Sequence, residues 1–150
     1  MNDTEYMKKA LNEAKKAFLL DEVPIGACIV DPKTGKIIAK AHNKTEYGND
    51  ATAHAEILVL RKACSKLKSK RLWGLDLYVT LEPCTMCAAA ISFARIRRMV
   101  YGAADKKGGA IESGVKFYQS NTCHHKPEVI SGILADESAK LLKDFFQKKR

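Results

Sequence analysis

The chain of 150 residues is 46% hydrophobic and 29% charged, a composition ordinary for a globular protein, and its length fits one compact domain over residues 1–150. No uninterrupted apolar run approaches the roughly 20 residues that cross a bilayer, and acidic residues occur where a signal peptide would lie, so we expect a cytoplasmic protein without a membrane partner. The net charge of +9 favours a nucleic-acid partner, because Lys and Arg release counterions from phosphates, although a lysine-rich solvated surface gives the same sum.

The first part of the chain predicts a helix followed by a hairpin. Hydrophobic residues from Met7 to Phe18 recur at helical spacing, and Asn2 or Asp3 precedes them as an N-cap. Short apolar runs at 25–30 and 37–41 flank a turn that contains proline and glycine. This pattern is typical of two strands joined by a chain reversal.

Helix and strand signals alternate through the middle of the chain. Residues 53–66 return to helical periodicity, and residues 75–80 alternate as a strand does. A second helix is predicted to begin just after Pro83 and to run to about Ala94, before a short strand at 99–101. The αβαβ order indicates a layered sheet.

The last third of the chain is less regular. Residues 102–123 mix glycines with charged residues, which predicts a functional loop around a short helix. Val129 and Ile130 form a brief last strand, and residues 135–149 form a final helix. The inward-facing candidates of that helix are Leu141, Leu142, Phe145 and Phe146.

Five cysteines are an odd number in a chain without a secretion signal, so we expect packed, reactive or metal-bound thiols and no disulfide framework. Cys84 and Cys87 are three residues apart at the start of a predicted helix, so they share a face near its positive end. Such a pair suits zinc, which prefers thiolate and imidazole ligands. A redox site or two packed thiols would have the same spacing.

His54 and Glu56 supply the other half of a possible metal site. Both lie at the predicted start of a helix, where their side chains can reach a site beyond the helix end. Each alone has a plainer explanation, since a histidine can simply be hydrogen-bonded and a glutamate favours a helix N-terminus. With Cys84 and Cys87, His54 makes three zinc ligands and leaves one tetrahedral position for water. Glu56 is then the catalytic candidate, which moves protons from that water to a ring nitrogen and to departing ammonia.

These residues carry a family resemblance. His54-Ala55-Glu56 followed by Pro83-Cys84-Thr85-Met86-Cys87 matches the signature of the cytidine-deaminase superfamily. Residues 21–27, 81–84 and 132–137 resemble bacterial tRNA-specific adenosine deaminases, and the resemblance covers almost the whole chain. It implies an α/β fold, a three-layer αβα sandwich with a central five-stranded mixed sheet, and a homodimer. It also implies one Zn²⁺ per subunit, with a bound water or hydroxide, and conversion of adenosine to inosine at the wobble position of a tRNA anticodon stem-loop.

The resemblance assigns substrate contacts by position. They fall on Asn43, on the backbone at Ala55, on Asp105, and on Phe146 and Lys149 near the end of the last helix. An asparagine amide can donate and accept, and an aromatic ring with nearby cations suits RNA. Otherwise Asn43 closes a turn, Asp105 is a solvated loop acid and Phe146 belongs to the core. Lys148 and Arg150 lie in the same basic stretch.

Three alternatives remain open from the residues alone. A deaminase of a free base or nucleoside, such as cytosine or guanine, would use the same zinc and glutamate. A noncatalytic zinc-stabilised RNA-binding module would take Cys123, His124 or His125 as a fourth ligand. A redox protein would use the two cysteines but would leave His54 and Glu56 without a role.

Overall fold

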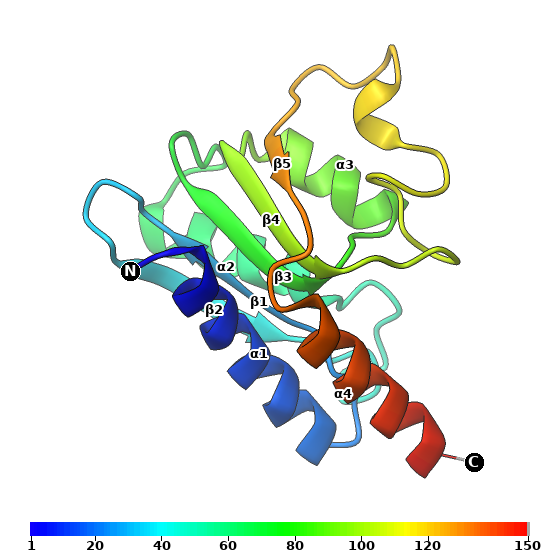
Figure 1. The fold of residues 1–150 in the computed structure, drawn as a ribbon. Helices are drawn as coiled ribbons and strands as arrows, with labels where there is room; N and C mark the ends of the chain where they lie inside the picture. The colour runs from blue at the N-terminus through cyan, green and yellow to red at the C-terminus, as the bar shows by residue number, and fades with distance from the viewer. Residues whose placement is uncertain (150) are drawn as a thin grey trace.

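A five-stranded mixed sheet forms the centre of the protein in the computed structural model, which describes residues 1–149 (Figure 1). The strand order is β2-β1-β3-β4-β5, with β1 antiparallel to β2 and β3, and with β3, β4 and β5 parallel. The strands are β1 (Gly26–Val30), β2 (Ile37–His42), β3 (Asp76–Leu81), β4 (Arg98–Ala103) and β5 (Glu128–Ile130).

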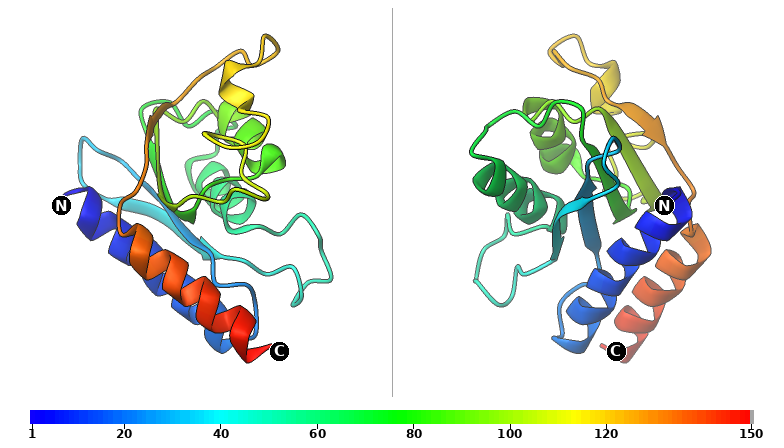
Figure 2. Two further views of the ribbon diagram at one scale, coloured as in Figure 1. Left: turned by 45° about the vertical axis from the view of Figure 1, so that its right-hand side comes forward. Right: turned by 90° about the vertical axis from the view of Figure 1, so that its left-hand side faces the viewer.

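Helices cover both faces of this sheet. Those in the described residues are α1 (Asp3–Leu19), α2 (Ala55–Leu67), α3 (Thr85–Phe93) and α4 (Ala135–Lys148), and η1 (Phe117–Gln119) is a 3₁₀ turn. α1 and α4 lie side by side over one face, and α2 and α3 lie over the other (Figure 2). The predicted three-layer αβα sandwich is confirmed. Within residues 1–149, no helix has both the length and the apolar character that a membrane crossing requires.

Side chains of the central strands alternate between two cores. In β1, Ala27 and Ile29 join the core under α2 and α3, whereas Cys28 and Val30 join the core under α1. The alternation follows from the two-residue period of a strand. All five residues of β1 are therefore buried, which explains why its sequence is a continuous apolar run.

The first helix lies close against the sheet. Asn2 and Glu5 form a capping box at its start, as the choice of N-cap residues predicts. Further along the helix, Gly26 of β1 touches its backbone, and a Cβ at Gly26 would collide with the carbonyl oxygen of Ala10 and the amide of Ala14. Glycine is the residue that permits this approach.

The loops that carry the predicted site residues leave one edge of the sheet. β2, β3 and β4 point the same way, because β1 runs antiparallel to both β2 and β3, and β4 is parallel to β3. Asn43, Glu82 and Ala104, which directly follow these three strands, therefore lie at the same edge. In α/β proteins this carboxyl edge is where ligands bind.

The elements lie where the sequence predicts them, with shifts of one or two residues at their ends. One prediction for the last helix is wrong, because Phe146 is 48% exposed. Adjacent residues point about 100° apart on a helix, and Phe145 takes the inward position against Phe18. Leu141 and Leu142 are half-buried. Between residues 102 and 123 the short helix is the single 3₁₀ turn η1.

Candidate active site

Two helix starts bring three soft ligands together. His54 directly precedes α2, Cys84 directly precedes α3, and Cys87 lies in the first turn of α3. The Sγ atoms of Cys84 and Cys87 lie 3.6 Å and 3.5 Å from Nδ1 of His54. All three ligand atoms lie within 4.8 Å of one another. The structure therefore brings together the three residues that the sequence nominates as metal ligands.

The spacing of these atoms fits a zinc ion. Zinc bonds of about 2.3 Å to sulfur and about 2.0–2.1 Å to nitrogen, at tetrahedral angles, separate the two donor atoms by about 3.6 Å. The observed nitrogen to sulfur distances of 3.5 and 3.6 Å agree with this value. Within residues 1–149, no fourth His, Cys, Asp or Glu joins the group. Three protein ligands are typical of catalytic zinc sites, whereas structural sites have four.

The residues that could close the site as a fourth ligand have other partners. The Cys123 thiol donates to the carbonyl oxygen of His125 at 3.2 Å, and Ser92 donates to the same oxygen. Nε2 of His125 lies 2.7 Å from the carbonyl oxygen of Ile96. Neither Cys123 nor His124 nor His125 belongs to the ligand group found in the described residues. This arrangement argues against a closed, purely structural zinc site.

Glu56 lies in the first turn of α2, beside the three ligands. It is only 4% exposed, and burial raises its pKa to about 7, with the Cys87 thiol among its side-chain partners. A carboxyl group with a pKa near neutrality can both take up and release a proton at physiological pH. Burial and this pKa are compatible with proton transfer, and the role of Glu56 in catalysis stays a prediction.

The two thiols differ in their tendency to ionise. Hydrogen bonding with Cys87 lowers the pKa of Cys84 to about 4, and the same hydrogen bond together with burial raises the pKa of Cys87 above its usual range. A hydrogen bond with Cys84 also raises the pKa of His54. Two thiolates side by side repel each other, so the donor set favours a divalent cation that neutralises both.

Backbone hydrogen bonding joins the segment that follows Asn43 to the segment that precedes His54 and Ala55. Asn43 follows β2 and is 3% exposed, and the next residue, Lys44, donates its backbone N–H to the carbonyl oxygen of Ala53 at 3.0 Å. Ala55 is fully buried between His54 and Glu56 in the sequence. The contacts of Asn43 and Ala55 with a substrate stay predictions.

The other three predicted contacts meet in a hollow of about 980 Å³. Asp105, Phe146 and Lys149 all line it, although they lie in a loop and in α4. The Asp105 carboxylate accepts the backbone N–H groups of Lys107 and Gly108, so it also shapes its own loop. Arg150 lies outside the described residues. RNA binding by this hollow stays a prediction.

Sequence reasoning missed Glu82, which organises the loop beyond β4. Its carboxylate is 2% exposed and accepts backbone N–H groups of Asp105, Ile111, Glu112 and Ser113 at 2.9–3.1 Å. Burial opposes ionisation, but these hydrogen bonds outweigh it and lower the pKa of Glu82. The sequence marks Glu82 as part of the stretch 81–84 that resembles the family, but it does not indicate that the side chain holds a loop.

We expect Glu82→Gln to lower the free energy of unfolding by about 1–3 kcal/mol, because an amide nitrogen then faces buried N–H donors. Urea unfolding measures this loss, and hydrogen exchange of residues 105–113 should report earlier opening of the loop. Glu128→Gln, at an exposed glutamate of β5, is the matched control and should leave both unchanged. Equal stability of the two variants would contradict the role given to Glu82.

Comparison with known proteins yields close relatives. The MafB19-like deaminase family matches residues 1–150. The tRNA-specific adenosine deaminase of Agrobacterium fabrum (strain C58 / ATCC 33970) is 60% identical over 147 residues, which cover 98% of this chain and 95% of that protein.

Solved structures agree with this relationship. One from a study of A-to-I editing by tRNA:A34 deaminases at the wobble position matches with a TM-score of 0.90 and 60% identity, over 93% of this chain and 99% of that chain. The guanine deaminase of Bacillus subtilis matches with a TM-score of 0.65 and 33% identity, over 81% and 87% of the two chains. Both the identity and the TM-score are therefore much higher for the structure from the tRNA:A34 deaminase study than for the guanine deaminase.

Proposed function

Because this chain belongs to the tRNA-specific adenosine deaminase family, we propose that it converts adenosine to inosine at the wobble position of a tRNA anticodon loop. The reaction replaces the amino group on C6 of adenine with oxygen from water and releases ammonia. The meeting of His54, Cys84 and Cys87 beside the buried Glu56 carries this proposal. The 60% identity to a tRNA-specific enzyme supports the choice of substrate.

We propose that His54, Cys84 and Cys87 bind one Zn²⁺ per subunit. When bound, zinc acts as a Lewis acid that makes water a nucleophile near neutral pH. The donor set supports this metal, because thiolate and imidazole suit zinc, whereas magnesium and calcium prefer oxygen ligands.

Glu56 moves the protons of the reaction. Its carboxylate takes a proton from the attacking water, delivers it to N1 of the adenine ring, and then helps the amino group to leave as ammonia. Burial keeps Glu56 away from bulk water, so its protons pass to the substrate. Asn43 and the backbone of Ala55 hold the base, since an asparagine amide can donate and accept hydrogen bonds at once.

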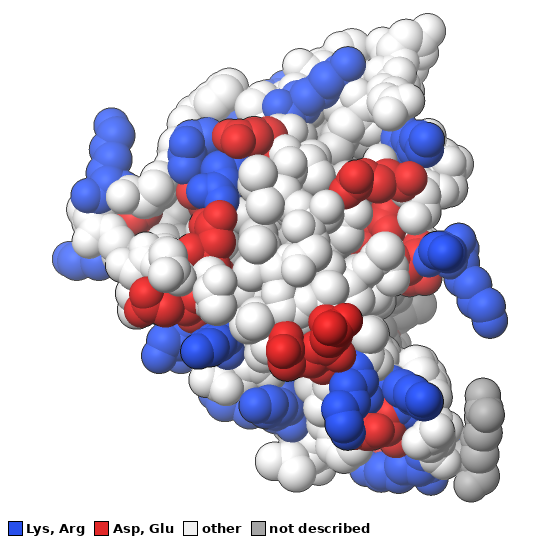
Figure 3. Space-filling view, viewed as in Figure 1, with Lys and Arg blue, Asp and Glu red and all other residues white. Residues whose placement is uncertain are grey.

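A tRNA anticodon stem-loop is the proposed partner. In an unpaired loop, the free-energy cost of extruding the target base is small, because little stacking and no base pairing is lost. Asp105, Phe146 and Lys149 contact the RNA in this proposal. On the face shown in Figure 3, Lys and Arg side chains lie mostly toward the rim, with Asp and Glu among them. The net charge of +9 favours attraction to RNA.

We further propose that the single catalytic domain forms a homodimer. Support comes from an apolar hollow between α2 and α3, which Ile57, Leu60 and Phe93 line. Phe93 is 65% exposed, and an exposed apolar surface of this kind favours contact with another protein. A tRNA substrate favours a cytoplasmic location.

The test is a comparison of substrates with the purified protein. We expect inosine in a synthetic anticodon stem-loop with adenosine at the wobble position, and none when that adenosine is moved one position along the loop. Deamination of free guanine or cytosine, with the RNA unchanged, would overturn the substrate assignment and leave the metal chemistry standing. A zinc-loaded protein that deaminates none of these would overturn the proposed catalysis.

A further inference from the structure

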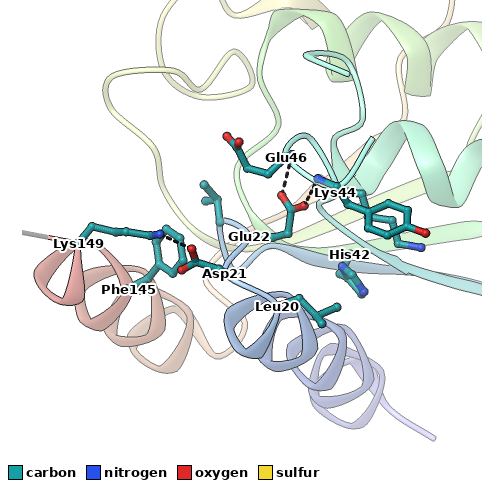
Figure 4. A pocket seen from close by; sticks show the side chains of 10 residues that line it. Leu20, Asp21, Glu22, His42, Lys44, Glu46, Phe145 and Lys149 are labelled. Atoms are coloured by element: carbon teal, nitrogen blue, oxygen red, sulfur yellow. Dashed lines mark hydrogen bonds and ion pairs between the residues drawn. The ribbon is translucent and has the colours of Figure 1, made fainter. Parts of the chain in front are cut away.

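The sheet has a long outer edge, which is the open side of β2. Within residues 1–149, β2 and β5 are the outermost strands, and β2 has six residues whereas β5 has three. The outer side of such a strand offers N–H and C=O groups to which another strand can add. Residues 37–40 are half-buried or exposed, whereas His42 is buried and lines a separate hollow with Leu20 and Lys44 (Figure 4). The part of the edge open to another strand is therefore 37–40.

The backbone groups of β2 face β1 and the open side in turn. The N–H of Asn43 donates to the carbonyl oxygen of Ile25, just before β1, so every second residue counted back from Asn43 faces β1. Lys40 lies between these positions and directs its N–H and C=O to the open side. The register with β1 skips Ile38, where it shifts. The carbonyl groups of Lys40 and Ile38 are thus the acceptors that a further strand would use.

Two lysines of α2 already bind these carbonyl oxygens. Nζ of Lys62 donates to the carbonyl oxygen of Lys40 at 2.8 Å, and Nζ of Lys66 donates to that of Ile38 at 3.3 Å. The two spacings match, because four residues advance about 6 Å along a helix and two residues advance about 7 Å along a strand. A strand that added to this edge would have to displace both lysines.

Charge adds to this closure of the edge. Residues of α1, β2 and α2 line a hollow of about 460 Å³ along the edge, and its lysines are Lys16, Lys40, Lys62 and Lys66. Glu13, which also lines the hollow, pairs with Lys16 at 2.7 Å. A second copy of the chain would bring the same lysines to the same edge, and like charges on facing strands oppose pairing.

We propose that Lys62 and Lys66 close the edge of β2 against β2 of a second copy. Residues 37–39 are Ile-Ile-Ala, so two uncovered edges can pair about a twofold axis with matching backbone groups. The two lysines prevent this by binding the carbonyl oxygens and by repelling the other copy. The edge shares no lining residue with the hollow proposed for the homodimer, so edge pairing would join one homodimer to the next.

The test is sedimentation velocity over a series of protein concentrations. Lys62→Ala/Lys66→Ala removes both hydrogen bonds and two charges, and alanine favours the helix. The weight-average mass of this variant should rise to about twice that of wild type or more as the concentration increases, because each edge then joins another molecule. Lys62→Arg/Lys66→Arg keeps the charges and the donors and should match wild type. Lys106→Ala/Lys126→Ala, at two exposed loop lysines, is the control for lost charge and should also match wild type.

A proline distinguishes strand pairing from other association. Lys40→Pro, added to the double alanine variant, removes an N–H that faces the open side, so β2 can stay paired with β1 while its outer edge is blocked. This triple variant should return to the mass of wild type, although it has lost a further positive charge.

Two results would overturn the inference. One is a double alanine variant with the mass of wild type at every concentration. The other is a triple variant as large as the double variant, because the association would then not use the backbone of β2. Melting temperatures check that the variants remain folded. Inosine formation by wild type tests only the proposed function, so the two proposals can fail separately.

Discussion

Replacing Glu56 with glutamine should lower kcat for inosine formation by about 10²- to 10⁴-fold, while the protein stays folded and keeps its zinc. Glutamine has the shape of glutamate but cannot take a proton from water or pass one to a leaving amine. Glu56 is 4% exposed, so bulk solvent has poor access to replace it as a proton carrier. Because the side chain moves protons and is not itself a metal ligand, zinc binding should survive.

The measurement is single-turnover inosine formation in the anticodon stem-loop at matched zinc content. Glu13→Gln provides the control, since Glu13 is also a buried glutamate but lies in α1 and pairs with Lys16. We expect that variant to keep the wild-type kcat. A Glu56→Gln protein within tenfold of wild type would show that another group moves the protons.

Replacing Cys87 with serine should abolish zinc binding and, with it, all deamination. Cys87 is fully buried in the first turn of α3, where a serine hydroxyl is a far poorer zinc ligand than a thiolate. His54 and Cys84 would be left as a two-ligand site. We expect the metal content to fall from about one zinc per chain to a small fraction of that, and the melting temperature to fall with it.

Metal analysis and reconstitution provide the check. A strong chelator should remove activity from wild type, and added Zn²⁺ should restore it there but not in Cys87→Ser. Cys64→Ser is the matched control, because Cys64 is a free, half-buried thiol outside the ligand group. A Cys87→Ser protein that keeps a full complement of zinc would remove Cys87 from the ligand set.

Local sequence predicts the cysteine pair and the histidine of the candidate metal site separately. It does not predict that they lie close together in the fold. The spacing of Cys84 and Cys87 and the position of His54 before its helix both follow from helix geometry. The approach of His54 to Cys84 depends on the sheet, whose central pairings join segments far apart in the chain. The family resemblance supplies that step, and the distances in the structure agree with it.

Other features left little trace in the sequence. Glu22 and Glu82 are both buried, and their partners are mostly backbone N–H groups, which nearly every residue has. No pattern of side chains can therefore reveal such partners. The wrong orientation for Phe146 has a similar origin, because two adjacent phenylalanines give no local indication of which one faces α1.

The pairing of β1 with β3, which sets Ala27 opposite Val79, determines when His54 and the two cysteines can meet during folding. His54 and Cys84 lie on different sides of β3 in the sequence, so a growing chain has made His54 well before it makes either cysteine. Pairing between distant segments is slow to form, because the entropy of loop closure opposes it. The three-ligand group can therefore be complete only once β3 has paired within the sheet, so its assembly depends on the fold of the whole domain and not on one local segment.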